Sequence, residues 1–577
     1  MVLGKTGRVC RRQLSAPTML GLFFILYLDM ILRILFLCVF SVCFSQNNTV
    51  LESFQSTSSF EINNIGDPLV SLMPIDMSIH FFLNHLSKDI RKIDFQEKNH
   101  FLLSDTIYSY ISYTGAYKYG GILETFLTRP IGKYVKLNFA YDNLSSEGFY
   151  NHQHNKYGNV LISIDFQKNT FYSSSFLFSS LNGKYEQSGG LVSYNQDLSP
   201  DLNPTYLTSA NTEVKTKKIK FSHTYFFDSG LKLKHDLSTL TFKRNFSDLN
   251  PSSFYYSFTN LDLGLENYHL DMFFNSIFNT FSLSKNKFNF SIHHNYYNTN
   301  DLSVDKIGDV IFSFNSTDIF KTQKNIYFNL AFCPIGYNQK NYLFDLRWYK
   351  KTSKFNHSVS FDILSKKPDF FRQHYINNSS WNWHDFSSST IFSFKLKSTL
   401  KKRNLLTSFV VSRSSNFLYF NEFASPMQLE DGLVYFNFRL NKIWHIGNLF
   451  LNTALCLQHT DNEVLSIPTF FYHQQIKYTY DLMNAFVLSS SLNSYFFSKY
   501  YPDYFFPLTD VFHQQRTQES ILQPFFSGDI LISKKDFSCG LIFTNLQNLF
   551  LSESYFIPQY ILPKPTIRFS IKWGFVD

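Results

Sequence analysis

Apolar and polar residues alternate along most of the chain, from about Thr106 to the last residue. From Val135 to Tyr141 and from Tyr342 to Trp348, every second residue is apolar and most of the residues between are polar. A period of two predicts strands with one apolar face and one polar face. The polar positions that we select as candidates for a lumen-facing side are Lys136, Asn138, Asp345 and Arg347.

The segments between these strands alternate in length. Tight polar turns are expected at residues 131–133, 167–169, 228–230, 285–287, 351–354, 401–404 and 534–536. Longer connections are expected at residues 143–158, 182–217, 244–275, 366–379, 412–431, 499–524 and 546–565. Short turns on one edge of a sheet and long loops on the other are typical of outer-membrane β-barrels, whose turns are periplasmic and whose loops are extracellular.

The number of strands follows from these breaks. About 22 strands fit between a first strand near residues 106–114 and a last strand at 566–575, with an even number between about 18 and 22 as the range. In hydrocarbon every backbone polar group needs an internal partner, so the sheet is expected to close. The predicted fold is therefore all-β: a transmembrane, antiparallel, up-and-down β-barrel over residues 106–577.

The residues before the barrel divide into two parts. In the first, basic residues between Lys5 and Arg12 precede an apolar stretch from Met19 to Phe44 that Asp29 and Arg33 interrupt. Two charges in one membrane span are costly, so we interpret residues 1–45 as an N-terminal extension plus a signal peptide, with the signal proper at 30–45. An uncleaved anchor helix is the alternative. Residues 46–105 lack the alternation and are expected to form a periplasmic or lumenal segment.

Composition excludes several functions. Aromatic residues make up 19% of the chain and charged residues only 17%. Without residues 1–45, which hold five of the 53 basic and one of the 44 acidic residues, the formal charge is +5. This charge is too small to indicate nucleic-acid binding. Cys333, Cys456 and Cys539 are too scattered for a disulfide framework or a zinc site, and no known catalytic motif occurs. We expect neither an enzyme nor a cofactor.

The last strand carries a continuous apolar stripe of five residues: Ile567, Phe569, Ile571, Trp573 and Phe575. Before the barrel closes, the backbone groups of such a strand are unpaired and can add to the edge of another sheet. We interpret the stripe as a signal for the barrel-assembly machinery. The alternative is an ordinary barrel strand, and Val576 and Asp577 depart from signals that end on the aromatic residue.

Three segments resemble the putative porin family of outer-membrane barrels. The first is the run Ser146, Glu147, Gly148, Phe149 and Tyr150 after the third strand. The second runs from Pro368 through Trp381 to Phe386, and the third from Asn545 to Trp573, with Gln559 where that family usually has glycine. The likeness extends from about residue 100 to the end of the chain. It implies a pore-forming barrel in the outer membrane.

A barrel of this size encloses more space than its own side chains fill. We therefore expect a porin in contact with outer-membrane lipids, through which small hydrophilic solutes diffuse passively, with residues 182–217 or 244–275 folded inward as a constriction. One alternative is a plug-less or reduced substrate-specific receptor barrel. Others are a non-conducting structural or secretion-associated surface barrel and a soluble, secreted all-β protein. The sequence leaves the oligomeric state open.

Overall fold

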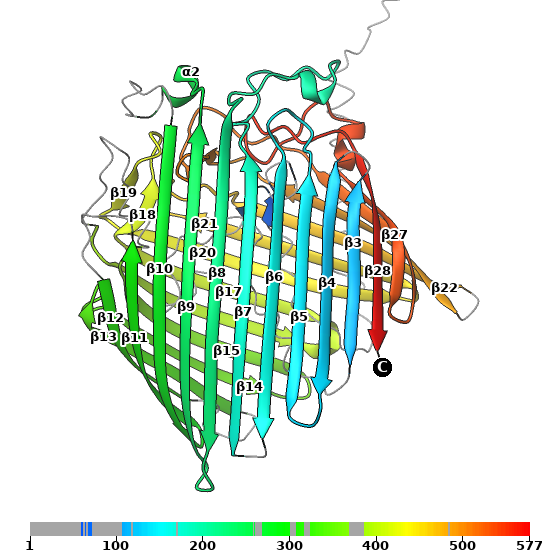
Figure 1. The fold of residues 1–577 in the computed structure, drawn as a ribbon. Coiled ribbons are helices and arrows are strands. Elements are labelled where there is room, and N and C mark those ends of the chain that lie inside the picture. Colours follow the sequence, from blue (N-terminus) through cyan, green and yellow to red (C-terminus); the bar gives the residue numbers. More distant parts are fainter. Residues whose placement is uncertain are drawn as a thin grey trace, which may run out of the picture. The chain divides into compact units, whose positions relative to one another are not determined.

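Twenty-two antiparallel strands form a closed barrel in the computed structural model (Figure 1). The structure describes residues 59–61, 64, 67, 69–71, 107–116, 119–168, 171–257, 259, 268–299, 307–316, 324–368, 386–482 and 485–576. The ring closes where β28 (Thr566–Val576) pairs with β3 (Tyr108–Ala116), with Phe569 opposite Gly115. The predicted fold class and the upper strand number are confirmed.

The barrel strands follow one another around the ring in chain order, and small hairpins in the loops account for the gaps in their numbering. Between β3 and β28 the ring contains β4 (Gly120–Ile131), β5 (Val135–Ser146), β6 (Asn155–Lys168), β7 (Tyr172–Glu186), β8 (Ala210–Phe226), β9 (Leu231–Asp248), β10 (Tyr268–Lys285), β11 (Phe288–Thr299), β12 (Ile307–Ser316), β13 (Lys324–Gly336), β14 (Tyr342–Lys351), β15 (Phe355–Lys366), β16 (Ser389–Leu400), β17 (Leu405–Ser415), β20 (Leu433–Ile446), β21 (Leu449–Thr460), β22 (Phe470–Leu482), β23 (Phe486–Phe497), β26 (Phe525–Lys534) and β27 (Phe537–Thr544).

The polarity of the two faces is reversed relative to a water-soluble protein. On β8 the exposed alternate positions are large and apolar, as at Phe221 and Tyr225, whereas Ser222 between them is buried. The face of Ser222 is the inner one, because Ala210 on the same face packs in one cluster with Leu508, from a loop inside the ring. The apolar stripes therefore point outward and the polar positions point into the lumen.

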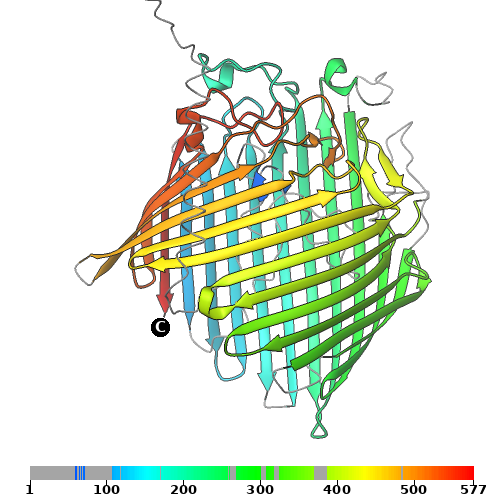
Figure 2. The same ribbon diagram turned by 180° about the vertical axis from the view of Figure 1, so that it is seen from behind.

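Connections at the two ends of the barrel differ as expected. At the short-turn end, β10 and β11 are joined by two residues, and Asn286 there has a φ of 54°, the left-handed conformation that tight hairpin turns require. At the long-loop end the connections are several times longer and contain short elements, including α2 (Ser253–Tyr256) (Figure 2). Within the described ranges, no helix is long and apolar enough to cross a membrane.

The predicted long connections were too wide. Residues 182–186 belong to β7 and 210–217 to β8, so the loop between them is 187–209. Likewise β9 continues to Asp248 and β10 begins at Tyr268. These strand ends are polar on the outside, where Lys184 and Lys215 form ion pairs with Glu213. Apolar alternation stops where the outer face turns polar, but the backbone pairing continues.

Candidate functional site: a loop lid above a polar lumen wall

The long-loop end is covered by loops that pack together. We call this set the lid, and it comprises residues 187–209, 249–257, 416–432, 498–524 and 545–565. Its largest buried cluster combines Leu207, Tyr256, Phe420 and Phe506, one from each of four loops. All four are at most 6% exposed. Burial of large apolar side chains from separate loops stabilises their association by about 1.5–3 kcal/mol each.

One loop of the lid reaches the opposite wall. Residues 498–524 connect β23 to β26, and β23 lies ten strands from β9 in the ring of 22. The guanidinium of Arg244, a buried residue on β9, nevertheless donates hydrogen bonds to the carbonyl oxygens of Leu508 (2.9 Å) and Pro507 (2.5 Å). The loop also contains a small hairpin, β24 (Tyr504–Phe506) and β25 (Val511–His513). It therefore crosses the mouth of the barrel.

The constriction was expected elsewhere. Loops 187–209 and 249–257 do contribute Leu207 and Tyr256 to the lid core, but loop 498–524 is the one that crosses. Sequence gave no reason to select it among seven long connections. Arg244 stood at the edge of a predicted connection and carried no signal, because its partners are carbonyl groups more than 260 residues away.

A second contact joins loops 187–209 and 545–565 of the lid. The amide of Leu191 in loop 187–209 donates to the carbonyl of Gln559 in loop 545–565 at 2.8 Å. Gln559 has a φ of 72°, in the left-handed region that favours glycine. The position where the family usually has glycine thus keeps a glycine-like conformation. Beside it, Tyr560 and Ile557 pack on Phe505 of the crossing loop.

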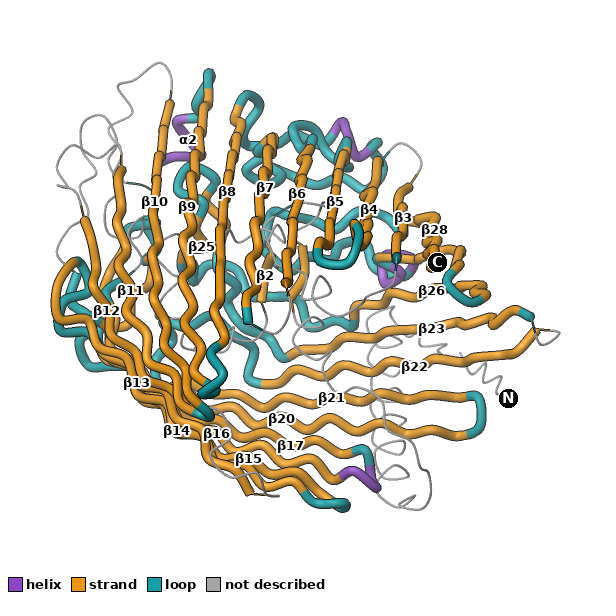
Figure 3. The backbone as a smooth tube through the Cα atoms, turned by 60° about the horizontal axis from the view of Figure 1, so that its bottom comes forward, coloured by secondary structure: helices purple, strands orange, loops and turns teal. Residues whose placement is uncertain are grey.

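The segment Ser146 to Tyr150 holds a hairpin from the N-terminal region. This hairpin consists of β1 (Ser59–Glu61) and β2 (Leu69–Ser71), which Figure 3 shows inside the ring of strands. Ser146 Oγ donates to Asn64 Oδ1 at 2.7 Å, and Asn64 Nδ2 donates to the carbonyl of Gln153 at 2.7 Å. Asn155 Nδ2 donates to Asp67 Oδ1 at 2.7 Å. The hairpin is therefore attached to residues 146–155, and the location expected for residues 46–105 stays a prediction.

The aromatic residues of the same segment face the lid. Phe149 and Tyr150 are buried in one cluster with Leu191 and Ile561. The backbone just before Phe149 is shaped by Gly148, whose φ of 77° and closeness to the Cβ of Gln153 leave no room for a side chain. The segment thus connects the N-terminal hairpin on one side to the lid on the other. Glu147 makes no contact that bears on this arrangement.

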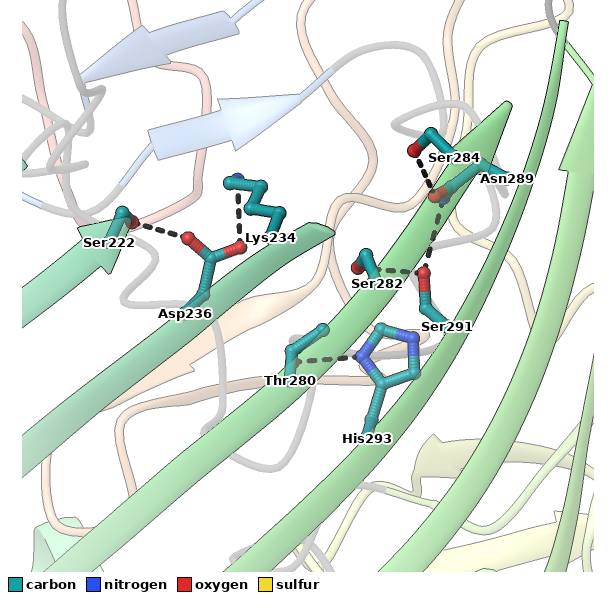
Figure 4. A network of polar contacts seen from close by, with 9 residues as sticks. All are labelled: Ser222, Lys234, Asp236, Thr280, Ser282, Ser284, Asn289, Ser291 and His293. Atoms are coloured by element: carbon teal, nitrogen blue, oxygen red, sulfur yellow. Dashed lines mark hydrogen bonds and ion pairs between the residues drawn. The ribbon is translucent and has the colours of Figure 1, made fainter. Parts of the chain in front are cut away.

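Below the lid, neighbouring strands present a connected polar wall to the lumen (Figure 4). Thr280 on β10 and Ser313 on β12 each lie 3.0 Å from a ring nitrogen of His293 on β11. Nearer the short-turn end, Ser291 Oγ donates to Ser282 Oγ at 2.9 Å, and Lys234 pairs with Asp236 at 2.7 Å. These side chains occupy the positions that alternate with the outward apolar stripe. The wall is polar, charged and hydrogen-bonded.

The four candidate lumen-facing residues lie in two separate groups on inward positions. Asn138 is fully buried and donates to Ser163 (2.9 Å) and Asp165 (2.9 Å), with Lys136 on the same face of β5. Asp345 and Arg347 form a two-point ion pair on β14, with N–O distances of 2.6 and 2.9 Å. The structure does not bring the two groups together, because β5 and β14 belong to different sectors of the ring.

The apolar stripe of the last strand does not face the lumen. Ile567, Phe569, Trp573 and Phe575 are between 45% and 58% exposed on β28, alternating with inward positions. The stripe thus faces outward with the rest of the apolar surface, and its role in assembly stays a prediction. Trp381 and residues 1–45 lie outside the described residues.

Burial also shifts ionisation equilibria in the crossing loop. Burial raises the pKa of Asp503 from its ordinary value to about 6, although a hydrogen bond from Ser466 and the charge of Arg516 oppose the shift. Burial lowers the pKa of His513 to about 4. A buried carboxyl and a buried imidazole both favour their neutral forms. The lid therefore contains two groups whose proton affinities change if the loop moves into water.

A closed antiparallel ring with an apolar exterior and a polar interior defines a membrane β-barrel of the outer-membrane type. The chain belongs to the family described as "Putative porin", whose model matches residues 45–577. No curated protein matches the sequence.

Several solved structures share the fold. The siderophore receptor PirA from Acinetobacter baumannii is 10% identical, with a TM-score of 0.58 over 82% of this chain and 81% of that chain. A ferric enterobactin receptor mutant from Pseudomonas aeruginosa, in complex with enterobactin, is 9% identical, with a TM-score of 0.58 over 82% of each chain. The copper transporter OprC is 9% identical, with a TM-score of 0.59 over 81% of this chain and 80% of that chain.

Proposed function

We propose that this protein is an outer-membrane pore through which small hydrophilic solutes diffuse passively, and that the lid controls their entry. The observation that carries the proposal is the reversed polarity of the closed ring, with lipid-compatible residues outside and a hydrogen-bonded polar wall inside. In this proposal the long loops are extracellular and the short turns periplasmic. A barrel of 22 strands leaves a lumen that its own strand side chains do not fill.

A second candidate is a solute-specific receptor barrel. Two observations favour it: loop 498–524 crosses the mouth, and the hairpin of β1 and β2 is bound inside the ring. A receptor of this kind would admit its solute only after the lid has been displaced by specific binding. The first candidate requires only that the lid open and close by thermal motion.

Liposome swelling with neutral sugars of increasing size separates the two candidates. For a passive pore, we expect the full chain to swell liposomes without an energy source, at rates that fall smoothly with sugar size. A heat-shift gel of the same preparation, in which a closed barrel stays compact in cold detergent, confirms that the protein is folded. Liposomes containing heat-unfolded protein are the matched control.

A folded barrel that gives no swelling with any sugar contradicts passive diffusion. If removal of the Arg244 contact by Arg244→Leu then produces swelling, the second candidate is favoured. If neither protein conducts, the barrel is not a pore.

A further inference from the structure

Strand β8 carries lysines on both faces of the barrel wall. Lys215 and Lys217 alternate with the inward positions, and Lys215 forms an outer-face ion pair with Glu213. Lys218 and Lys220 fall on the other face, together with Ala210 and the buried Ser222. Because Lys217 and Lys218 are consecutive, they lie on opposite faces of the strand. The backbone pairing is regular along the whole strand.

Strand β9 extends this inward charge. Lys232 and Lys234 occupy the same face as Arg244, and Asp236 is the one acidic side chain among the inward positions of β8 and β9 between the lid and the short-turn end. Asp236 accepts from Ser222 and pairs with Lys234 at 2.7 Å (Figure 4). Four lysines and one aspartate leave this part of the wall with a formal charge of +3.

Uncharged hydrogen-bonding groups continue the wall on the next two strands. The inward residues of β10 and β11 facing this region are Thr280, Ser282, Ser284, Asn289, Ser291 and His293, linked by hydrogen bonds of 2.7 to 3.1 Å. Hydroxyl and amide groups can donate to an oxyanion beside a lysine ammonium, and they bring no competing negative charge. The basic part of the wall therefore has hydrogen-bond donors next to it.

The first strands of the barrel do not share this charge. On β4, β5 and β6 the inward positions include Glu124, Asp142 and Asp165 against Lys136, a formal charge of −2. On β14 and β15, Arg347 pairs with Asp345, and Lys395 of β16 lies 3.5 Å from Asp362. Lys397 on β16 and Lys572 on β28 also fall on inward positions. The positive charge of β8 and β9 therefore contrasts with β4, β5 and β6.

We infer that the inward wall of β8 and β9, with Lys218, Lys220, Lys232 and Lys234, is an anion-attracting surface that makes the pore prefer small anionic solutes over cations of the same size. This inference rests on the proposed pore function. A wall charged with one sign raises the local concentration of the opposite ion in the lumen. The effect declines with salt, because the Debye length falls from about 30 Å at 0.01 M to about 3 Å at 1 M.

The alternation on β8 provides a matched pair of variants. Lys218→Gln with Lys220→Gln removes two inward charges, whereas Lys215→Gln with Lys217→Gln removes two outward charges from the same strand. The probe is potassium chloride, and the measurement is the reversal potential across a planar bilayer under a salt gradient at low ionic strength. Coulomb's law gives about a fivefold change in local concentration for two unit charges about 8 Å from an ion in water. Because chloride falls and potassium rises by this factor, we expect the inward variant to lower the chloride-to-potassium permeability ratio by about 25-fold.

The outward variant is expected to keep the wild-type ratio, and the difference between the two variants should disappear near 1 M salt. Equal ratios in both variants and the wild type would overturn the inference. Swelling of liposomes by arabinose is measured on the same proteins, since it depends on the pore and not on its charge. If arabinose causes swelling but the permeability ratio is the same in both variants and the wild type, only the role of the lysines is contradicted. If folded wild-type protein gives no arabinose swelling, the proposed pore itself is contradicted.

Discussion

The lid and the wall below it are built from different chemistry. The lid associates loops from several parts of the chain through buried aromatic and aliphatic side chains, such as Phe506 and Tyr256. The wall of β8 to β12 has serine, asparagine, histidine and lysine side chains, held by strands whose backbone pairing does not depend on them. We therefore expect the lid to change conformation more readily than the wall. This difference suggests that the lid decides whether a solute enters and the wall decides which solute passes.

The largest effect is expected from separating the lid from the opposite wall. Arg244→Leu removes both hydrogen bonds to the crossing loop, at 2.9 and 2.5 Å. Hydrogen bonds from a charged donor contribute about 1.5–3 kcal/mol each, so we expect open-channel conductance events to become at least about tenfold more frequent. Single-channel recording in planar bilayers measures this.

The control for this variant is Arg413→Leu. Arg413 lies on an exposed outer position of β17, towards the same end of the barrel, and its loss should not change the recordings. If Arg244→Leu conducts as the wild type does, the crossing loop is not held by that contact. The proposal that the lid controls solute entry and the wall controls selectivity would then be contradicted.

A smaller effect is expected from releasing the N-terminal hairpin. Asn64→Ala removes the hydrogen bonds that this buried residue makes with Ser146 Oγ and with the carbonyl of Gln153. Leaving buried polar groups unsatisfied costs about 1–3 kcal/mol. We expect amide hydrogen exchange at β1, β2 and residues 146–155 to accelerate, while exchange in β8 to β12 stays unchanged.

Asn182→Ala serves as its control, because Asn182 is exposed on β7. If Asn64→Ala and Asn182→Ala exchange alike, the Ser146 segment does not anchor the hairpin. Faster exchange that spreads into the loops 187–209 and 545–565 would show in addition that the hairpin supports the lid.

The smallest effect is expected from pH, because two groups in the crossing loop oppose each other. The closed lid raises the pKa of Asp503 to about 6, so this residue stabilises closure at acid pH and loses that contribution as the pH rises from about 4 through 6. The closed lid lowers the pKa of His513 to about 4, so this residue stabilises closure above about pH 6.5 and loses the contribution as the pH falls towards 4. The wild-type response should be shallow.

Single substitutions should expose each titration. Asp503→Asn leaves His513, so channel opening is expected to increase as the pH falls from about 6.5 to 4. His513→Asn leaves Asp503, so opening should increase as the pH rises over the range from about 4 to 6. Conductance measured across this range tests both signs. Identical flat profiles in both variants would mean that the crossing loop does not move into water.

The membrane-spanning part of the fold could be predicted from the sequence because its pattern is local. Alternation such as that of Phe221 and Ser222 reports a strand with one lipid face, and each tight turn separates two such strands. The strand ends were missed at residues 182–186 and 210–217, where the outer face becomes charged. There the backbone pairs although the apolar pattern has ended.

The candidate site was less predictable, because it depends on contacts between distant residues. Local alternation was enough to select Asn138 and Arg347 as candidates. The crossing of loop 498–524, in contrast, involves carbonyl groups that any residue could supply. The family resemblance identified Ser146, which binds Asn64. No local pattern connects these two residues, because 82 positions separate them.

The pairing of β28 with β3 has a consequence for biogenesis. Thr114 and Ser570, whose hydroxyl groups lie 3.0 Å apart at this seam, are separated by 456 positions, so the ring cannot be sealed until the final residues have been synthesised and exported. Until then the protein has two unpaired strand edges that must be shielded from water and from other chains. A frameshift or nonsense codon that removes β28 would leave the edges of β27 and β3 permanently unpaired.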